Sequence, residues 1–288
     1  MSTQPADRTA TDASASANAG WDCHAHVFGP YDRYPLAAER GYTPPEASLP
    51  DYLAHLASPG LGHGVLVHPS AYGVDHALVL DTLARQPTLR GVLVAQPHTL
   101  PSLQGLREKG VRALRYSARG GAASNFAGSA TFDELETMAP ALADAGLHAE
   151  LWTDRHILPG IADRIRALPV PVVIDHMAGF DATAGIDEPG FRCLLDLLAE
   201  GRVWVKLCAY RNLLAITDRS GWAEVLAPFQ QALQQANAAQ LVWGSDWPYL
   251  NVKEPPQGGW LLRLLHDSVG DMAIERGILQ DNPVRLYG

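Results

Sequence analysis

The sequence predicts a single-domain α/β fold, a (β/α)8 TIM barrel, from three observations. The chain has 288 residues, and a barrel of this kind typically needs about 250. Short apolar runs alternate with stretches whose apolar residues recur at three- and four-residue spacing, as in amphipathic helices. No glycine-rich phosphate-binding turn follows the first apolar run, although an open doubly wound sheet would more often carry one. We expect residues 1–20 to form a disordered tail and residues 21–288 to form the barrel.

Eight apolar runs are the expected strands. Each is short and rich in β-branched or large apolar residues, and turn-forming residues lie between them. In chain order they span residues 21–26, 64–68, 91–95, 111–116, 147–152, 171–176, 203–208 and 241–246.

Six stretches between these runs have helical periodicity. In chain order they span residues 75–85, 100–109, 132–145, 157–168, 191–199 and 222–236. Gly110, Gly146, Pro169 and Gly201 lie at the junctions, where glycine and proline end helices. No change of composition marks a second domain.

Composition and charge restrict the classes of function. A net charge of −9 and a pI of about 5.6 argue against a nucleic-acid-binding surface, which is basic. No segment approaches the roughly 20 apolar residues of a membrane span, and residues 1–20 lack the apolar block of a signal peptide. Cys23, Cys193 and Cys208 are odd in number and widely spaced, which indicates reduced thiols. We therefore expect a cytoplasmic monomer or homodimer that acts on a small molecule.

Unusual polar residues stand at the ends of the expected strands, where TIM barrels hold their active sites. The first strand ends in His24 and His26, whose i, i+2 spacing points both imidazoles to one face. Buried charges cost several kcal/mol unless they are paired, so a convergence of such groups favours a functional site. The other strand ends contribute His68, Arg115, Tyr116, Trp152, Asp175, His176, Lys206, Cys208, Arg211 and Asp246.

Five segments together resemble the amidohydrolase superfamily. They begin at Asp22 (DCHAHVFG), Val173 (VIDHMAG), Val205 (VKLCAYR), Leu241 (LVWGSDWP) and Asp281 (DNPVRLYG). More narrowly, they resemble the branch of 2-pyrone-4,6-dicarboxylate lactonase and related sugar lactonases, over residues 21–288. The resemblance implies a TIM barrel that hydrolyses a lactone to a hydroxy acid. The same branch also contains lactone isomerases.

The resemblance also bears on metal binding. The superfamily holds one or two divalent ions through the H-x-H pair, an anion on strand four, histidines on strands five and six, and an aspartate on strand eight. This chain has Arg115 on strand four and Trp152 on strand five, so we expect no two-metal centre. We expect catalysis without a cofactor, as in the resembled lactonase. The alternative is a single Zn²⁺ on the retained positions, which are His24, His26, His176 and Asp246.

For the reaction we expect Asp246 to act as general base on the attacking water and then to protonate the leaving hydroxyl. His24, His26 and His176 would donate hydrogen bonds to the oxyanion of the tetrahedral intermediate. The alternatives are lactone isomerisation at the same site, a zinc-dependent hydrolase or decarboxylase, and a non-catalytic binding protein on a decayed scaffold.

The expected substrate is a lactone that carries a carboxylate, of the pyrone, muconolactone or sugar-acid type. Arg115 and Arg211 are the expected carboxylate clamps. The resembled dicarboxylate lactonase has an arginine after its strand-six histidine and a histidine where Tyr249 stands, so these departures put the same pyrone substrate in doubt.

Further residues are expected around the substrate. Arg119 is a weaker clamp candidate, equally well explained as a solvated loop charge. Tyr42 and Tyr249 are expected to close over the substrate from loops, with His68 and Trp152 completing its surroundings. Behind this layer we expect Asp22, and Lys206 paired with a buried acid, which is Asp22, Glu150 or Asp175.

Overall fold

The computed structural model describes residues 19–99, 102–119, 129–250, 252–256 and 259–288. Eight parallel strands follow one another around a single sheet in chain order, and each pairs with the next. They are β1 (Gly20–Ala25), β2 (Leu61–Val67), β3 (Leu89–Leu93), β4 (Val111–Ala118), β5 (His148–Thr153), β6 (Val172–Ile174), β7 (Val203–Leu207) and β8 (Leu241–Trp243).

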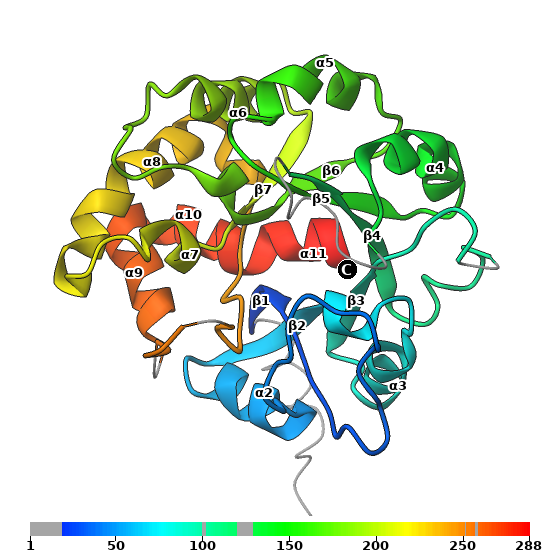
Figure 1. Ribbon diagram of the computed structural model, residues 1–288. Helices are drawn as coiled ribbons and strands as arrows, with labels where there is room; N and C mark the ends of the chain where they lie inside the picture. The colour runs from blue at the N-terminus through cyan, green and yellow to red at the C-terminus, as the bar shows by residue number, and fades with distance from the viewer. Residues whose placement is uncertain (1–18, 100–101, 120–128, 251, 257–258) are drawn as a thin grey trace, which may run out of the picture.

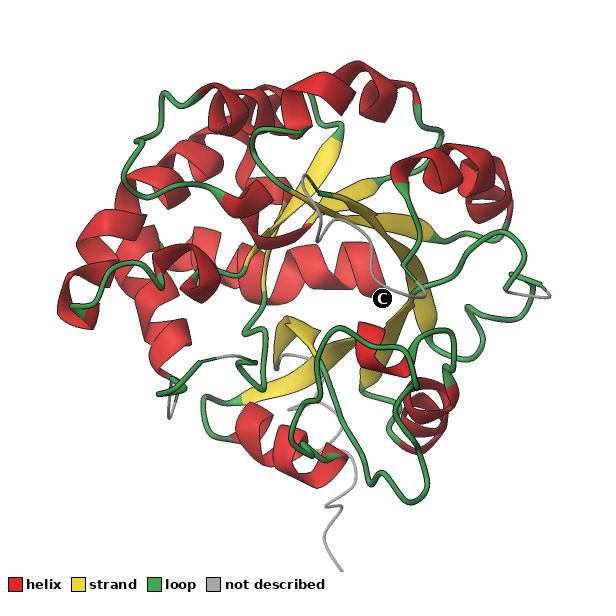
Figure 2. Ribbon diagram, viewed as in Figure 1, coloured by secondary structure: helices red, strands yellow, loops and turns green. Residues whose placement is uncertain are grey.

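Helices surround the strands, and the predicted TIM barrel is confirmed (Figures 1 and 2). The α-helices are α2 (Leu49–Ala57), α3 (Ala77–Arg85), α4 (Phe132–Asp144), α5 (Leu158–Ala167), α6 (Pro189–Ala199), α7 (Tyr210–Leu213), α8 (Trp222–Asn237), α9 (Trp260–Val269), α10 (Met272–Arg276) and α11 (Asn282–Tyr287). Short turns of helix are η1 (Ser70–Tyr72), η2 (Asp175–Gly179), η3 (Arg219–Gly221), η4 (Ala238–Gln240) and η5 (Gly277–Asp281).

The barrel closes at its C-terminal end, beyond the last residue of β8. The amide of His26 donates to the carbonyl of Trp247, and the amide of Asp246 donates to the carbonyl of His24, both at 2.8 Å. The segment after β8 is therefore fixed directly against the two histidines of β1.

The core has two layers. One lies between the strands and the surrounding helices. The other fills the barrel interior with buried residues of seven strands and of α11, namely Trp21, Cys23, Val65, Val67, Val92, Ala113, Val173, Trp204, Val242 and Tyr287. Helix α11 lies across the barrel behind the strands in Figure 1, and its Tyr287 ring stacks 6.4 Å from that of Trp21 near the start of β1. This arrangement closes the N-terminal end and leaves the C-terminal end for a site.

Local sequence explains several helix starts. Thr131 precedes α4 and accepts a hydrogen bond from the amide of Glu134, whose side chain accepts one from the amide of Thr131. Ser48 and Asp51 make the same capping box at α2. Each box satisfies amides that the first helical turn leaves without a partner.

The predicted helix over residues 100–109 is wrong for the residues that can be described. Residues 103–110 form bends and turns, and residues 100 and 101 lie outside the description. Gly105 has φ +77°, a left-handed conformation that interrupts a helix. Helices α2, α7, α9, α10 and α11 lie outside the six predicted stretches.

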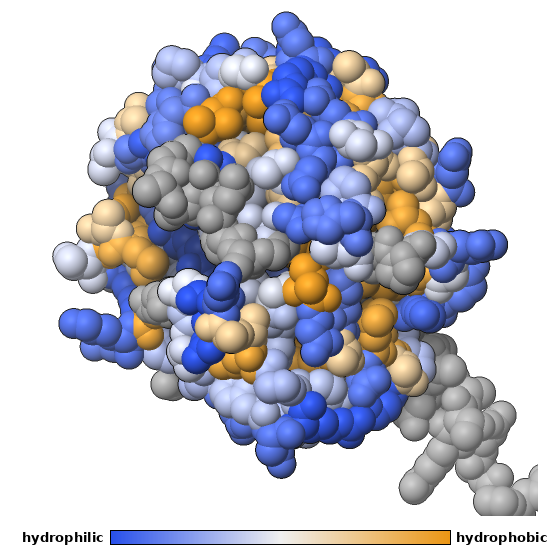
Figure 3. All heavy atoms as spheres, turned by 45° about the vertical axis from the view of Figure 1, so that its right-hand side comes forward, coloured by the Kyte–Doolittle hydropathy of each residue, from blue (hydrophilic) through white to orange (hydrophobic). Residues whose placement is uncertain are grey.

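The predicted tail lies outside the described residues up to position 18, and Gly20 already belongs to β1. In the described part of the chain, no helix combines the length and apolar character needed to cross a bilayer. On the face drawn in Figure 3, hydrophobic residues form separate patches between hydrophilic ones.

Candidate active site

The first strand changes its inward-facing row just before the two histidines. Trp21 and Cys23 belong to the interior cluster, yet His24 and His26 also reach the centre of the barrel. The pairing of β1 with β2 has an irregularity between Asp22 and Ala25. An extra residue of this kind shifts the alternation of a strand by one. It thus brings the histidine pair onto the inner face at the C-terminal end.

Asp246 is the centre of the site. Its Oδ1 atom lies 3.4 Å from Nε2 of His26 and 3.7 Å from Nε2 of His24, and its Oδ2 lies 3.5 Å from Nε2 of His176. Asp246 is 1 % exposed, and Oδ1 has no hydrogen-bond partner among the described residues. The structure therefore brings together the four residues that sequence analysis placed at the catalytic centre.

Backbone and side-chain partners fix what each imidazole can donate. Nδ1 of His26 lies 2.8 Å from the carbonyl of Val67, which can only accept, so this nitrogen carries a proton. In the neutral ring, Nε2 of His26 then has a lone pair and accepts. Burial lowers the pKa of His176, which favours its neutral form, and neither of its ring nitrogens has a partner among the described residues.

His24 has a partner for each of its tautomers. Its Nδ1 lies 3.3 Å from Nζ of Lys206 and 3.4 Å from Oδ1 of Asp175. When Lys206 donates to Nδ1, Nε2 carries the proton and is a donor. When Asp175 accepts from Nδ1, Nε2 has a free lone pair. Burial and the charge of Lys206 hold the pKa of His24 well below its usual range, so the ring is neutral.

Arg211 controls the charge of Asp246. Burial alone would raise the pKa of this carboxyl, but the ion pair with Arg211 and the rings of His176 and His26 directed at its oxygens hold it well below its usual range. Nε of Arg211 donates to Oδ2 of Asp246. Asp246 is therefore a carboxylate at neutral pH, with Oδ1 directed at the histidines.

A buried ionic network supports the site from below. Nζ of Lys206 lies 2.5 Å from Oε2 of Glu150 and 3.3 Å from Oδ1 of Asp175, and all three side chains are fully buried. Its two carboxylate neighbours outweigh burial and raise the pKa of Lys206, which stays an ammonium. Two of the three predicted partners are thus confirmed, while Asp22 is not among them.

Asp22 holds β1 to the loop that carries Asp246. Its Oδ1 accepts from the amides of Ser245 (2.8 Å) and His24 (3.2 Å), and its Oδ2 accepts from the hydroxyls of Ser245 (2.6 Å) and Tyr52 (3.4 Å). Burial raises the pKa of Asp22 to about 6 despite these bonds.

Three guanidinium groups line the rim in one common arrangement. Arg115, Arg119 and Arg211 each donate Nε to a carboxylate, which belongs to Asp175, Asp154 and Asp246 respectively. No hydrogen bond from their terminal Nη groups is found within the described residues. The carboxylates therefore orient the guanidiniums and leave their ends for an anion.

The ring of Trp152 makes cation–π contacts with two of these guanidinium groups. The guanidinium carbons of Arg115 and Arg119 lie 4.9 and 4.3 Å from the centre of its ring, and the ring of His176 meets it edge-on at 6.4 Å. Arg119 thus lies next to Arg115 rather than apart in solvent. Gly120 and Gly121 of its loop lie outside the described residues.

The predicted loop tyrosines share one cavity. Tyr42 and Tyr249 line a space of about 590 Å³ together with prolines of both loops. The positive charges of Arg115 and Arg211 act on Tyr42 and oppose the rise of its pKa that burial causes. Tyr42 therefore lies close to the cationic rim.

His68 was expected beside the substrate, and its ring forms a hydrogen bond with the loop after β2. Its Nε2 bonds to the carbonyl of Gly73 at 2.8 Å, and its ring packs 4.8 Å from that of His76. Burial lowers the pKa of His68 to about 3, so the ring is neutral. The described contacts of its ring are with the loop after β2, and its amide donates to the carbonyl of Val92 on β3 at 2.8 Å.

A single divalent ion fits this donor set. Tetrahedral bonds of about 2.0–2.1 Å place ligand atoms about 3.3–3.4 Å apart, close to the 3.4 and 3.7 Å that separate Oδ1 of Asp246 from His26 and His24. These three residues form one of the groups able to hold an ion. A second ion would meet the cation of Arg115 on β4 and the ring of Trp152 on β5.

Three supporting residues escaped sequence analysis. Asp154 orients Arg119, and Ser245 links Asp22 to the Asp246 loop. Gly244 is required by space, because a Cβ there would lie 2.6 Å from Cβ of His24 and 2.8 Å from Sγ of Cys208. The available signals were the run LVWGSDWP, which contains Gly244 and Ser245, and the position of Asp154 two residues after Trp152.

Comparisons with known proteins agree with this geometry. The family model described as Amidohydrolase matches residues 21–288. The chain is 34% identical to 4-sulfomuconolactone hydrolase of Rhizobium radiobacter, over 99% of this chain and 95% of that protein. It is 31% identical to 2-pyrone-4,6-dicarboxylate hydrolase of Comamonas testosteroni, over 92% and 89%.

A solved structure resembles the barrel. It is that of a putative 2-pyrone-4,6-dicarboxylic acid hydrolase from Pseudomonas putida, with a TM-score of 0.78 and 28% identity over 94% of this chain and 97% of that one.

Proposed function

The chain belongs to the amidohydrolase family, and on this premise we propose that it is a lactone hydrolase that opens an anionic lactone by water attack on the ester carbonyl. One observation carries the proposal. Oδ1 of the buried Asp246 carboxylate is unpaired among the described residues and faces the imidazoles of β1, beside a rim of guanidiniums. A water bound there meets a base, oxyanion donors and an anion-binding surface at once.

In the proposed reaction, Asp246 takes a proton from the water as its oxygen attacks the carbonyl carbon. The ring C–O bond of the tetrahedral intermediate then breaks, and Asp246 returns the proton to the leaving oxygen. Proton transfer of this kind typically contributes 10²–10⁴-fold in rate. The product is a hydroxy acid, which loses its proton to solvent at neutral pH.

The carbonyl oxygen needs donors as it becomes an oxyanion. Nε2 of His24, protonated when Lys206 donates to Nδ1, and a ring nitrogen of His176 supply them. A preorganised donor of this type contributes about 3 kcal/mol. When the ring of His26 is neutral, Nδ1 donates to Val67 and Nε2 accepts, so we propose for it a role other than the oxyanion donor expected from sequence. We assign it to accepting a hydrogen bond from the water.

The cationic rim supports an anionic substrate. Arg115, Arg119 and Arg211 offer oriented Nη groups that match the paired oxygens of a carboxylate or sulfonate. The positive charge of Arg211 lowers the pKa of Asp246. A substrate anion bound to Arg211 partly neutralises that charge. The pKa of Asp246 then rises, and its carboxylate becomes a stronger base. The named substrates of the relatives, a sulfomuconolactone and a pyrone dicarboxylate, are anionic lactones.

We propose catalysis without a metal, because Arg211 already neutralises Asp246 and Lys206 supports the His24 tautomer that donates at Nε2. If one ion binds, His24, His26 and Asp246 hold it. A divalent ion there would polarise the carbonyl and lower the pKa of a bound water.

A lactone panel tests the function. Pyrone dicarboxylate, sulfo- and carboxymuconolactones, and aldono- and aldarolactones are each incubated with the enzyme, with and without chelator, while acid release is followed. We expect release of one proton per molecule from an anionic lactone and much slower turnover of its uncharged analogue. Formation of an isomeric lactone without acid release would instead indicate an isomerase.

A further inference from the structure

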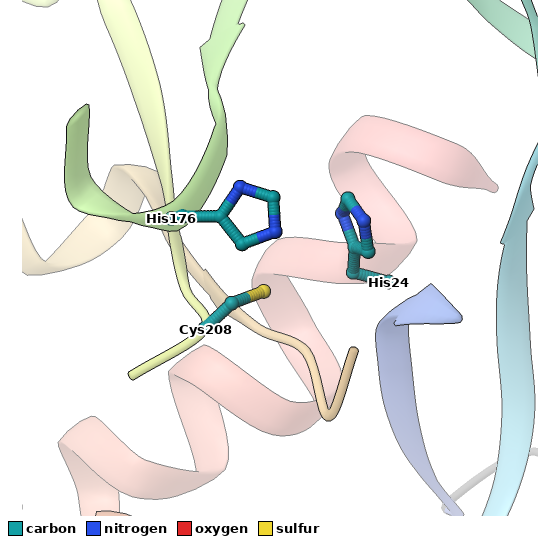
Figure 4. A group of neighbouring side chains, drawn as sticks. All are labelled: His24, His176 and Cys208. Carbon is teal, nitrogen blue, oxygen red and sulfur yellow. The ribbon is translucent and has the colours of Figure 1, made fainter. Parts of the chain in front are cut away.

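Cys208 completes a second group of ligand atoms beside the hydrolytic centre. It follows β7 directly and extends the inward row of Trp204 and Lys206. Figure 4 shows its sulfur directed toward the rings of His24 and His176, which come from β1 and η2. One ligand atom from each of the three lies within 4.8 Å of the others, and all three residues are buried.

The ring nitrogens of His24 and His176 are independent evidence that this group can bind a ligand. Nε2 of His24 and both ring nitrogens of His176 are buried without a hydrogen-bond partner among the described residues. Both side chains are more than nine-tenths buried. Asp175 can accept the Nδ1 proton of His24 at 3.4 Å, and this leaves Nε2 free as a ligand.

We propose that His24, His176 and Cys208 form an inhibitory site for soft, thiophilic divalent cations. Thiolate and imidazole ligands select soft ions over ions that prefer oxygen. Cd²⁺ is an ion of this soft class, and its thiolate bond gives a spectroscopic signal.

Binding at this site blocks hydrolysis, because it takes two of the imidazoles that surround Asp246. It also requires the thiol to lose its proton. A thiol with its ordinary pKa is protonated at neutral pH, so Cys208 carries a proton before an ion binds. Each Cd²⁺ therefore forms a metal–sulfur bond and releases one proton to the buffer. The group of His24, His26 and Asp246 has no thiol proton to release.

The test is titration of the full chain with Cd²⁺, in a Cys193→Ser background that removes the partly exposed thiol. We expect one Cd²⁺ per chain, an ultraviolet sulfur-to-cadmium charge-transfer band and release of one proton. Cys208→Ser should abolish the band and weaken inhibition by at least about 100-fold, since even outer ligand partners are worth 10–100-fold. It should leave the circular dichroism spectrum and the basal activity in place.

Three outcomes would overturn the proposal. One is a band that survives Cys208→Ser, which would assign it to Cys23. Another is Cd²⁺ binding with neither band nor proton release, which would assign the ion to Asp246 and the β1 histidines. The last is no binding at all. If Cys208→Ser does not fold, Cys208→Ala and His176→Ala are read in the same way. The spectroscopic result does not depend on which lactone is the substrate.

Discussion

The protonation of Asp246 depends on a small set of neighbours, and each can be changed separately. Arg211 supplies the positive charge, while His26 and His176 direct their rings at its oxygens. Their combined effect outweighs the burial that would otherwise raise its pKa. A carboxylate with so low a pKa is always charged at neutral pH but is a weak base, so its strength depends on what else binds Arg211.

Replacing Arg211 by Met tests this dependence. We expect the pKa of Asp246 to rise, which moves the acidic limb of the kcat/KM profile to higher pH. We also expect kcat/KM for an anionic lactone to fall by about 10- to 100-fold, because a charge-assisted hydrogen bond is worth about 1.5–3 kcal/mol. Arg119→Met is the control, since Arg119 contacts Asp154 instead. An acidic limb that moves equally in both variants would contradict the assignment.

Asp22 gives the fold a distinct pH dependence. Its pKa is about 6 in the folded protein, against an ordinary aspartate pKa of 3.8, so its contribution to stability is fully present below 3.8 and is lost as pH rises through about 6. Between pH 4 and 7.5 this amounts to about 2 kcal/mol.

Urea denaturation of Asp22→Asn measures that contribution. The amide can keep the bonds to the Ser245 and Tyr52 hydroxyls, and it does not titrate. We expect the variant to gain about 2 kcal/mol relative to wild type between pH 4 and pH 7.5. A stability difference that is the same at both pH values would show that Asp22 stays charged throughout.

At the scale of elements, three of the proposed catalytic residues, His26, His176 and Asp246, lie just past the ends of the observed strands β1, β6 and β8. β6 ends at Ile174 and β8 at Trp243, although both were predicted to continue to the site. His176, Met177 and Ala178 have φ of 51–54°, and Asp246 has φ 58°. These left-handed backbone conformations cost about 1–2 kcal/mol per residue. No sequence pattern predicts them in residues other than glycine. Periodicity therefore located the strand ends but not the turns that aim the side chains.

Gly244→Ala tests the close approach of β1, β7 and the β8 loop. The added Cβ meets His24 and Cys208 inside normal contact distance, and overpacking of this kind typically costs 1–3 kcal/mol. We expect a lower melting temperature and a clear loss of kcat. Gly160→Ala on α5 is the control, because nothing lies within 4 Å of its added methyl group. If both variants melt like wild type, the packing described here is wrong.

At the scale of the whole molecule, the alternation of apolar runs was enough to predict the barrel and its C-terminal site. Sequence could not decide between long-range partners. Lys206 had three candidate acids, and only the fold shows that Glu150 and Asp175 face it while Asp22 faces Ser245. The irregularity in β1 was also hidden, because a spacing of two predicts the same face without saying which.

The charge distribution of the whole site leads to a prediction about cofactors. Arg211 pairs with Asp246 and Lys206 pairs with Asp175, so the carboxylates at the centre already have positive partners and hydrolysis does not need a divalent ion. We expect dialysis against chelator to leave kcat and KM unchanged within error. Loss of activity that added Zn²⁺ restores would contradict metal-free catalysis and assign the ion to His24, His26 and Asp246.

The most direct test of the account is the steady-state kinetics of Asp246→Asn on the best anionic lactone of the panel, compared with wild type and with Asp154→Asn. The account predicts that Asp246→Asn lowers kcat by about 10²–10⁴-fold, as expected for loss of a general base. Asp154→Asn makes the same charge change at the rim, where it orients Arg119, and should act mainly on KM. An Asp246→Asn enzyme with wild-type kcat would contradict the central claim.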